Sequence, residues 1–173
     1  MSQAVAERKR NGTPVSVSRS GALVVTALSI LGLSACAHNP AERATPTATR
    51  AEAQERTADV QRRIIDAFPA GSVGETRTGS WTLLDCSEDD VQSSIGADLT
   101  LTREVPVEST YDAISRGLRS AGYDDERNTT SHGRRLVVTG PGNDQYFVSI
   151  LNDSRRVQIS SFSQCFPGSL TDG

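Results

Sequence analysis

The sequence predicts an α+β domain in which a single antiparallel sheet of about five to six strands has two helices packed on one face. Three observations support this fold class: two segments repeat core-type residues at helical spacing, several short segments alternate apolar and polar residues, and turn sequences join the later segments directly. Strands that alternate in this way turn one face to the core and one to solvent, so both helices are expected on the same face.

The first expected helix spans residues 51–67. Its core-facing residues recur every three or four positions and are Thr57, Val60, Ile64, Ile65 and Phe68. Pro69 and the glycine-containing segment after it end the helix.

Two strands are expected after this helix. The first covers residues 79–86 and turns Trp81, Leu83 and Asp85 to one face. The second covers residues 98–102, where leucines alternate with polar residues and are expected to point inward.

The second helix is expected over residues 108–121. Its apolar stripe consists of Val107, Tyr111, Ile114, Leu118 and Ala121. Ser109 and Asp112 have the spacing of a capping box, and Gly122 is a typical C-terminal stop.

Three further strands are expected at residues 134–139, 145–151 and 156–162. Turn sequences at 140–143 and 152–154 connect them. Another short strand is expected at 126–130, paired with the next one through the turn at 131–133.

The first 35 residues have the pattern of a lipoprotein signal peptide. A basic segment is followed by an apolar run at 21–33, which is short for a transmembrane helix of about 20 residues and typical of a signal peptide. The run ends in Leu33-Ser34-Ala35-Cys36, where small residues admit the backbone to a signal peptidase and the Cys36 thiol takes a diacylglyceryl group. An ordinary secretory signal with an incidental Cys36 and an uncleaved membrane anchor remain as alternatives.

This pattern divides the chain into a signal peptide at 1–35, a flexible tether at 36–50 and an extracytoplasmic domain at 51–173. The tether is rich in Ala, Thr and Pro and has no apolar periodicity. The lipid on Cys36 would carry two acyl chains, for example from palmitate, and two chains are enough for stable attachment to a membrane. We therefore expect a secreted protein held on the outer side of the cell membrane by its lipid.

The three cysteines fit this expectation. If lipid modifies Cys36, then Cys86 and Cys165 remain as a pair in an oxidising compartment, where a disulfide is expected. Such a bond would stabilise the domain by roughly 4.5 kcal/mol in the chain-entropy estimate. Two free buried thiols are the alternative, and a metal site is not expected because no further ligands lie at a suitable spacing.

The charge excludes one class of partner. Residues 1–35 hold four basic residues and one acid, so 14 basic and 20 acidic residues follow and give a net charge of about −6. A domain of this sign repels nucleic acid.

The order of these features resembles that of the LppA-like lipoproteins of actinobacteria. The matching features are the lipobox ending at Cys36, the helix containing Arg63-Ile64-Ile65-Asp66, the strand with Trp81 followed by Cys86, and Cys165-Phe166 after a strand. They cover residues 36–167 in order and spacing. The resemblance implies a small lipid-anchored envelope protein, supports the disulfide pairing, and implies no catalytic residues.

The residues themselves predict no enzyme, cofactor or metal site. Nucleophile elbows, zinc-binding motifs and phosphate loops are absent from the sequence, His38 lies in the tether, and His132 lies in a turn. The acids at 85–90 and 124–126 are interpreted as solvated loops, with a carboxylate-dependent hydrolase of envelope material as the alternative function.

The arginine pairs at 134–135 and 155–156 are interpreted as charges that protect exposed strands, with a patch for an anionic partner as the alternative. We therefore expect a non-catalytic module that binds an envelope protein or a small ligand.

Overall fold

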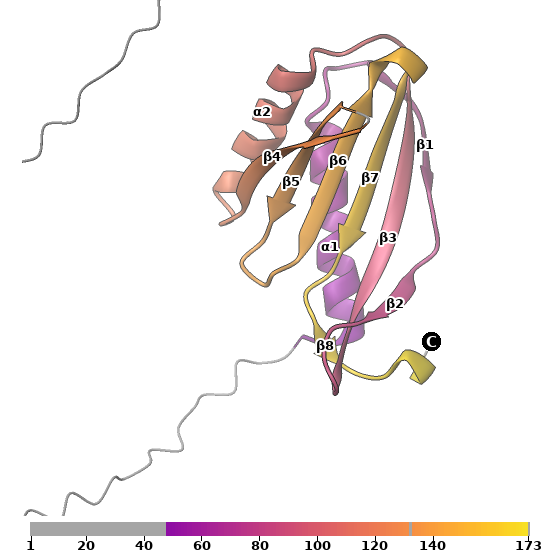
Figure 1. Ribbon diagram of the computed structural model, residues 1–173, viewed down its shortest axis with the longest axis vertical. Helices are drawn as coiled ribbons and strands as arrows, with labels where there is room; N and C mark the ends of the chain where they lie inside the picture. Colours follow the sequence, from indigo (N-terminus) through magenta and orange to yellow (C-terminus); the bar gives the residue numbers. More distant parts are fainter. Residues whose placement is uncertain (1–47, 132, 173) are drawn as a thin grey trace, which may run out of the picture. The chain divides into compact units, whose positions relative to one another are not determined.

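The computed structural model describes residues 48–131 and 133–172, which fold into one sheet backed by two helices (Figure 1). The fold class predicted from the sequence is confirmed: the domain is α+β, with an antiparallel sheet and one disulfide. The elements in chain order are α1 (Arg50–Asp66), β1 (Val73–Thr78), β2 (Thr82–Asp85), β3 (Asp90–Leu101), α2 (Val107–Arg119), β4 (Asp124–Thr130), β5 (Gly133–Thr139), β6 (Gln145–Leu151), the 3-10 turn η1 (Asn152–Ser154), β7 (Arg156–Phe162), β8 (Phe166–Pro167) and the 3-10 turn η2 (Leu170–Asp172).

The main path of the sheet runs in the order β1-β3-β7-β6-β5-β4. Strand β3 is long enough to pair with β1 and β2 on one side, and with β7 and the short β8 on the other. All these pairings are antiparallel. Strands β4 to β7 form a meander joined by short turns, as the turn sequences predicted.

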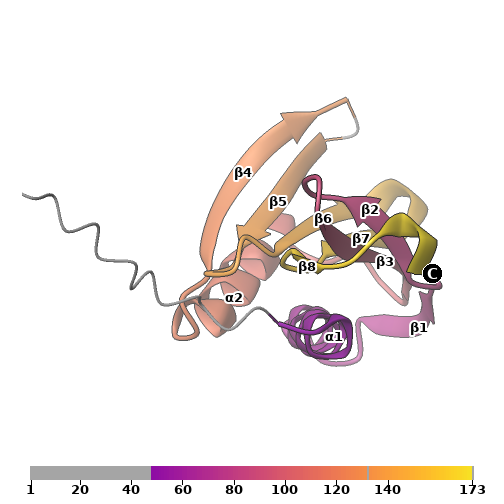
Figure 2. The ribbon, with the colours of Figure 1, turned by 90° about the horizontal axis from the view of Figure 1, so that it is seen from below.

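Both helices lie on the same side of the sheet (Figure 2). The core fills the space between them and the sheet, because each strand turns alternate apolar residues toward the helices. Ile64 of α1, Ile114 and Leu118 of α2, and Leu136 and Val148 of the sheet are each at most 1% exposed.

Helix α1 contacts the sheet partly through polar side chains. The amide of Gln54 donates to Ser93 Oγ at 3.0 Å, and that of Gln61 donates to Ser161 Oγ at 3.1 Å. Arg56 donates to Gln164 Oε1 at 2.7 Å. Helix α1 is therefore held by hydrogen bonds along much of its length, while Ala53 packs in a small apolar cluster near its start and Val60 and Ile64 join the main core.

The structure corrects several local expectations. Residues 98–102 form only the end of a twelve-residue strand, β3, and the strands β1 and β8 were not expected. The capping box predicted at Ser109 and Asp112 is wrong: the N-cap of α2 is Pro106, and no side chain caps it. A capping box exists instead at the start of α1, where Thr49 and Glu52 bind each other's backbone N–H.

The disulfide predicted between Cys86 and Cys165 is confirmed, with an S–S distance of 2.05 Å. It links the end of β2 to the segment between β7 and β8. A small cluster of Ala53, Val91 and Phe166 packs beside this end of the sheet. The bond thus stabilises a part of the domain that has few core residues of its own.

Candidate functional site

Several residues singled out in the sequence lie outside the described part of the chain. These are Cys36 with its lipobox, the tether up to residue 47, His38 and His132. Glu88 and Asp89 are exposed at the turn between β2 and β3, as expected of a solvated loop. The loop expected at residues 124–126 is wrong, because these acids are exposed on strand β4. Among residues 48–131 and 133–172, no cluster of His, Cys, Asp and Glu has the geometry to hold a metal ion.

The two arginine pairs do not form one patch. Arg134 forms an ion pair with Glu108 of α2 at 3.2 Å, and Arg156 forms one with Asp98 of β3 at 2.9 Å. Arg155 has left-handed backbone geometry (φ 50°) at the end of η1. Arg135 is different, because it points away from the helices together with Ser149, its direct neighbour on β6.

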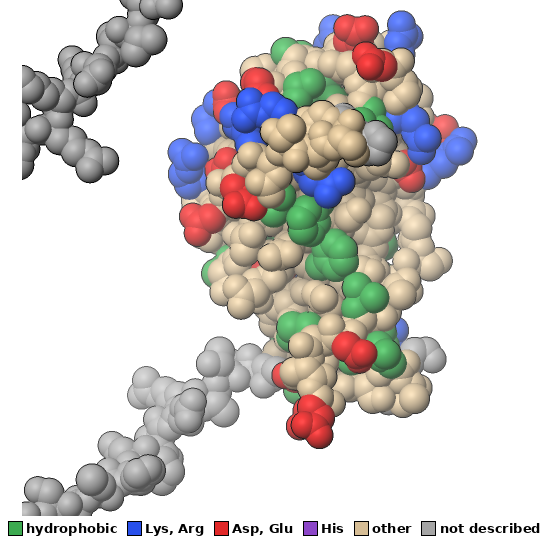
Figure 3. Space-filling view, in the orientation of Figure 1, with side chains coloured by type: hydrophobic (Ala, Val, Ile, Leu, Met, Phe, Trp, Pro, Cys, Tyr) green, Lys and Arg blue, Asp and Glu red, His purple; other side chains and the backbone are tan. Residues whose placement is uncertain are grey.

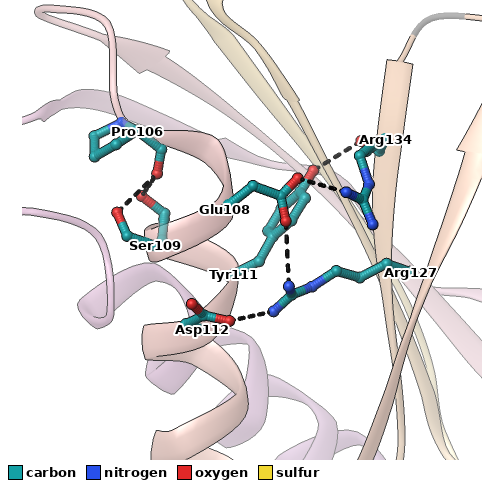
Figure 4. Close-up of polar contacts among 8 residues, drawn as sticks. Pro106, Glu108, Ser109, Tyr111, Asp112, Arg127 and Arg134 are labelled. Carbon is teal, nitrogen blue, oxygen red and sulfur yellow. Dashed lines mark hydrogen bonds and ion pairs between the residues drawn. The ribbon is translucent and has the colours of Figure 1, made fainter.

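An open notch of about 740 Å³ lies between the start of α2, the start of β5 and the end of β6. Glu108, Arg134, Asn152 and Asp153 are among its lining residues. Figure 4 shows how its charges are used: Glu108 contacts both Arg127 and Arg134, and Arg127 also contacts Asp112. These pairs join α2 to the β4–β5 hairpin and satisfy each other.

Electrostatics supports this structural role for the notch. The hydrogen bond from Arg127 holds the pKa of Asp112 below its usual value. Behind the ion pairs, the buried Tyr111 hydroxyl donates to the Arg134 carbonyl at 2.9 Å and accepts from the Ile150 N–H at 3.3 Å. Tyr111 thus fills the place of a ladder hydrogen bond where β5 and β6 separate, which fixes the hairpin rather than offering a reactive group.

A second polar cluster lies buried under the β5–β6 turn. Tyr123 and Tyr146 both donate to Asp144 Oδ2, at 3.1 and 2.9 Å. Burial, with a further contribution from the Asp144 charge, raises the pKa of Tyr123 to about 12, and the same causes raise the pKa of Tyr146. Asp144 is 1% exposed, so this cluster is closed to a ligand. Its role is to specify the core under the turn.

Another hollow lies on the face of the sheet that neither helix covers. It measures about 310 Å³, and we call it the outer-face hollow. Its lining residues come from three adjacent strands and are Arg135 of β5, Phe147 and Ser149 of β6, and Gln158, Ser160 and Phe162 of β7. Figure 3 looks onto this face and shows hydrophobic side chains gathered in a stripe along it, with charged side chains mostly around its margin.

The register of the strands explains the shape of this hollow. Ser149 pairs with both Arg135 and Gln158, and Phe147 pairs with Ser160. Small serines therefore stand between two phenylalanines and an arginine, which leaves a depression where large side chains would close the surface. The phenyl rings of Phe147 and Phe162 meet edge to face, with 5.7 Å between their centroids.

Arg135 borders the hollow in a defined position. Its Nε donates to Ser149 Oγ at 3.1 Å, and its guanidinium carbon lies 5.9 Å from the centre of the Phe147 ring. In the part of the chain that the structure describes, no ion pair joins Arg135 to a carboxylate. The hollow therefore combines two aromatic rings, a partly buried cation and neutral hydrogen-bonding groups.

No protein-family model, curated protein or solved structure matches this chain. Within the described residues, no helix has the length and apolar character needed to cross a membrane. The interpretation of function therefore depends on the signal pattern and on the geometry of the domain.

Proposed function

We propose that this chain is a lipid-anchored protein of the bacterial cell membrane whose extracytoplasmic domain binds a ligand or partner and performs no catalysis. The observation that carries the binding role is the outer-face hollow, because an unpaired arginine beside two half-buried phenylalanines is a typical recognition surface. The anchoring role rests on the lipobox ending at Cys36 and on the resemblance to the LppA-like lipoproteins.

The disulfide supports the compartment assigned in this proposal. Disulfides persist in oxidising environments outside the cytoplasm, and the Cys86–Cys165 bond closes a separation of 79 residues. With these two cysteines joined, Cys36 is the remaining thiol of the sequence. This supports Cys36 as the residue that receives lipid.

The rival function is a carboxylate-dependent hydrolase, and two acids, Glu108 and Asp153, line the notch. Glu108, however, forms ion pairs with Arg127 and Arg134 at 3.2 Å each. Both carboxylate oxygens of Glu108 are thus in contact with arginines, whereas a catalytic acid has to contact the substrate. The geometry therefore favours binding over hydrolysis.

A fractionation experiment tests the anchor. The full-length chain and its Cys36→Ala variant are expressed in a bacterium that processes lipoproteins, with a labelled fatty acid in the medium. The original chain is expected in the membrane fraction with label attached, and the variant is expected to lose the label. A variant with Cys86→Ala and Cys165→Ala is the matched control and should keep both label and membrane attachment. Equal labelling with and without Cys36 would overturn the proposed anchor.

A further inference from the structure

We propose that the outer-face hollow binds a small organic anion, namely a flat ring that carries one carboxylate or phosphate group. This inference rests on the proposed binding function and names the chemical class of the ligand. It follows from four properties of the hollow: its aromatic corner, its arginine, its neutral polar side chains and its size.

The aromatic corner selects a flat ring. Phe147 and Phe162 stand on neighbouring strands with ring planes at 90° to each other, so one presents its face where the other presents its edge. Aromatic rings attract a further ring most strongly in offset-stacked or edge-to-face geometry. A flat ring placed in this corner can contact one phenylalanine by its face and the other by its edge.

Arg135 selects an anion. The other arginines on this face are occupied, since Arg77 pairs with Glu75 and Arg156 pairs with Asp98. Arg135 uses its Nε for Ser149 and rests on the Phe147 ring, which fixes the guanidinium in position. A fixed guanidinium with free N–H groups binds carboxylate and phosphate oxygens in a forked geometry.

The surroundings of Arg135 limit the ligand to a small one. No carboxylate lines the hollow, although the chain from Cys36 onward carries about −6. The hollow is thus a positive spot on a negative domain. Because no acid lines the hollow itself, a single anionic group can bind at Arg135, whereas the net negative charge of the domain would repel a polyanion.

Size and polarity complete the match. About 310 Å³ is at the lower end of small-molecule sites, which span roughly 300–1,000 Å³. Gln158 and Ser160 add hydrogen-bonding groups to the hollow. A hydroxyl group on the ring would therefore find a partner, and we expect a hydroxylated ring to bind more tightly than a plain one.

The test is a ligand-detected NMR titration of the full chain in neutral detergent micelles, with empty micelles as the blank. The probes are 4-hydroxybenzoate and phenyl phosphate, with 4-hydroxybenzamide as the uncharged match and acetate as the anion without a ring. We expect both ring anions to bind and both controls to bind at least about tenfold more weakly. The amide lacks the charged hydrogen bond and acetate lacks the ring contacts, and each of these contacts contributes about tenfold or more in affinity.

Three variants locate the site. Arg135→Gln is expected to weaken 4-hydroxybenzoate by about tenfold or more and to leave 4-hydroxybenzamide unchanged. Phe147→Leu is expected to weaken both ring compounds. Arg62→Gln is the matched control, because Arg62 is an exposed arginine on α1, in an ion pair with Asp59, and its loss should change nothing.

The outcomes separate this inference from the proposed function. If charged and uncharged rings bind equally and Arg135→Gln has no effect, while Phe147→Leu weakens both, the hollow is a binding site but the anion preference is wrong. If no probe binds, or if Phe147→Leu and Arg135→Gln both leave binding unchanged, the inference that the hollow binds a ring anion is overturned, whereas the lipid anchor stands or falls by the labelling of Cys36.

Discussion

The disulfide gives the sharpest test of how this domain is stabilised. We consider replacing Cys86 and Cys165 together by serine, so that no unpaired thiol remains. Cys165 is exposed, so the substitution removes little buried surface, and the main change is in the unfolded chain. For a separation of 79 residues, the chain-entropy relation gives a loss of about 4.5 kcal/mol in the free energy of unfolding.

Urea unfolding measures this loss. With slopes of about 1–3 kcal/mol per molar urea, a loss of about 4.5 kcal/mol lowers the midpoint by about 1.5 M or more. Strand β8 pairs with β3 through only two residues, so β8 is expected to detach before the rest of the sheet. Reductant should lower the midpoint of the original chain and leave that of the variant unchanged. A loss below about 1 kcal/mol would refute the argument that the bond acts on the unfolded chain.

Three other predictions concern the interior, and each is measured by urea unfolding. Gly140→Ala should lower the free energy of unfolding by about 1–3 kcal/mol, because a Cβ there would lie 2.2 Å from Asp144 Oδ1. Gly117→Ala is the matched control: it has open space around it in α2 and should raise the free energy of unfolding by about 0.5–1 kcal/mol. Equal effects of the two substitutions would contradict the packing described. Tyr111→Phe should lose about 1–3 kcal/mol, since it leaves the Arg134 carbonyl without its 2.9 Å hydrogen bond, and an unchanged midpoint would show that the carbonyl has another partner. Tyr123 has a pKa of about 12 against an ordinary 10.0, so its contribution to the free energy of unfolding is complete below pH 10 and falls by up to about 2.7 kcal/mol as the pH rises toward 12. Tyr123→Phe should lose less stability than the original chain over this range. Identical pH profiles of the two proteins would contradict the prediction.

Much of the fold could be predicted because its periodic patterns are strong. The strands at 145–151 and 156–162 were predicted with the bounds that they have in the structure, since the first is rich in β-branched and aromatic residues, the second largely alternates apolar and polar residues, and turn sequences flank both. Strand β1 was missed because its residues Val73–Thr78 are nearly all exposed and show no alternation. The capping box was placed at the wrong helix because Ser109 and Asp112 have suitable spacing but lie inside α2, where Pro106 takes the N-cap position.

The candidate site was only partly accessible from sequence. The arginine pairs were identified from the sequence, but their different roles depend on residues distant in sequence. Arg134 forms an ion pair with Glu108, whereas Arg135 donates through its Nε to Ser149 and keeps N–H groups for a ligand. One signal was present and not used: Phe147 and Phe162 occupy outward positions of alternating strands, where polar residues are usual. Their meeting across two strands depends on register, which a single sequence does not reveal.

The polar attachment of α1 has a mechanical consequence. The chain enters the domain at Thr49, so tension in the preceding residues acts first on the initial turns of this helix. A force along the helix axis loads the bonds of Gln54, Arg56 and Gln61 together, whereas a force away from the sheet breaks them one after another. Resistance to pulling therefore depends on direction. Near its start, α1 contacts Val91 and Phe166 through Ala53, and Phe166 follows Cys165, so the Cys86–Cys165 bond keeps this part of the sheet connected when α1 yields.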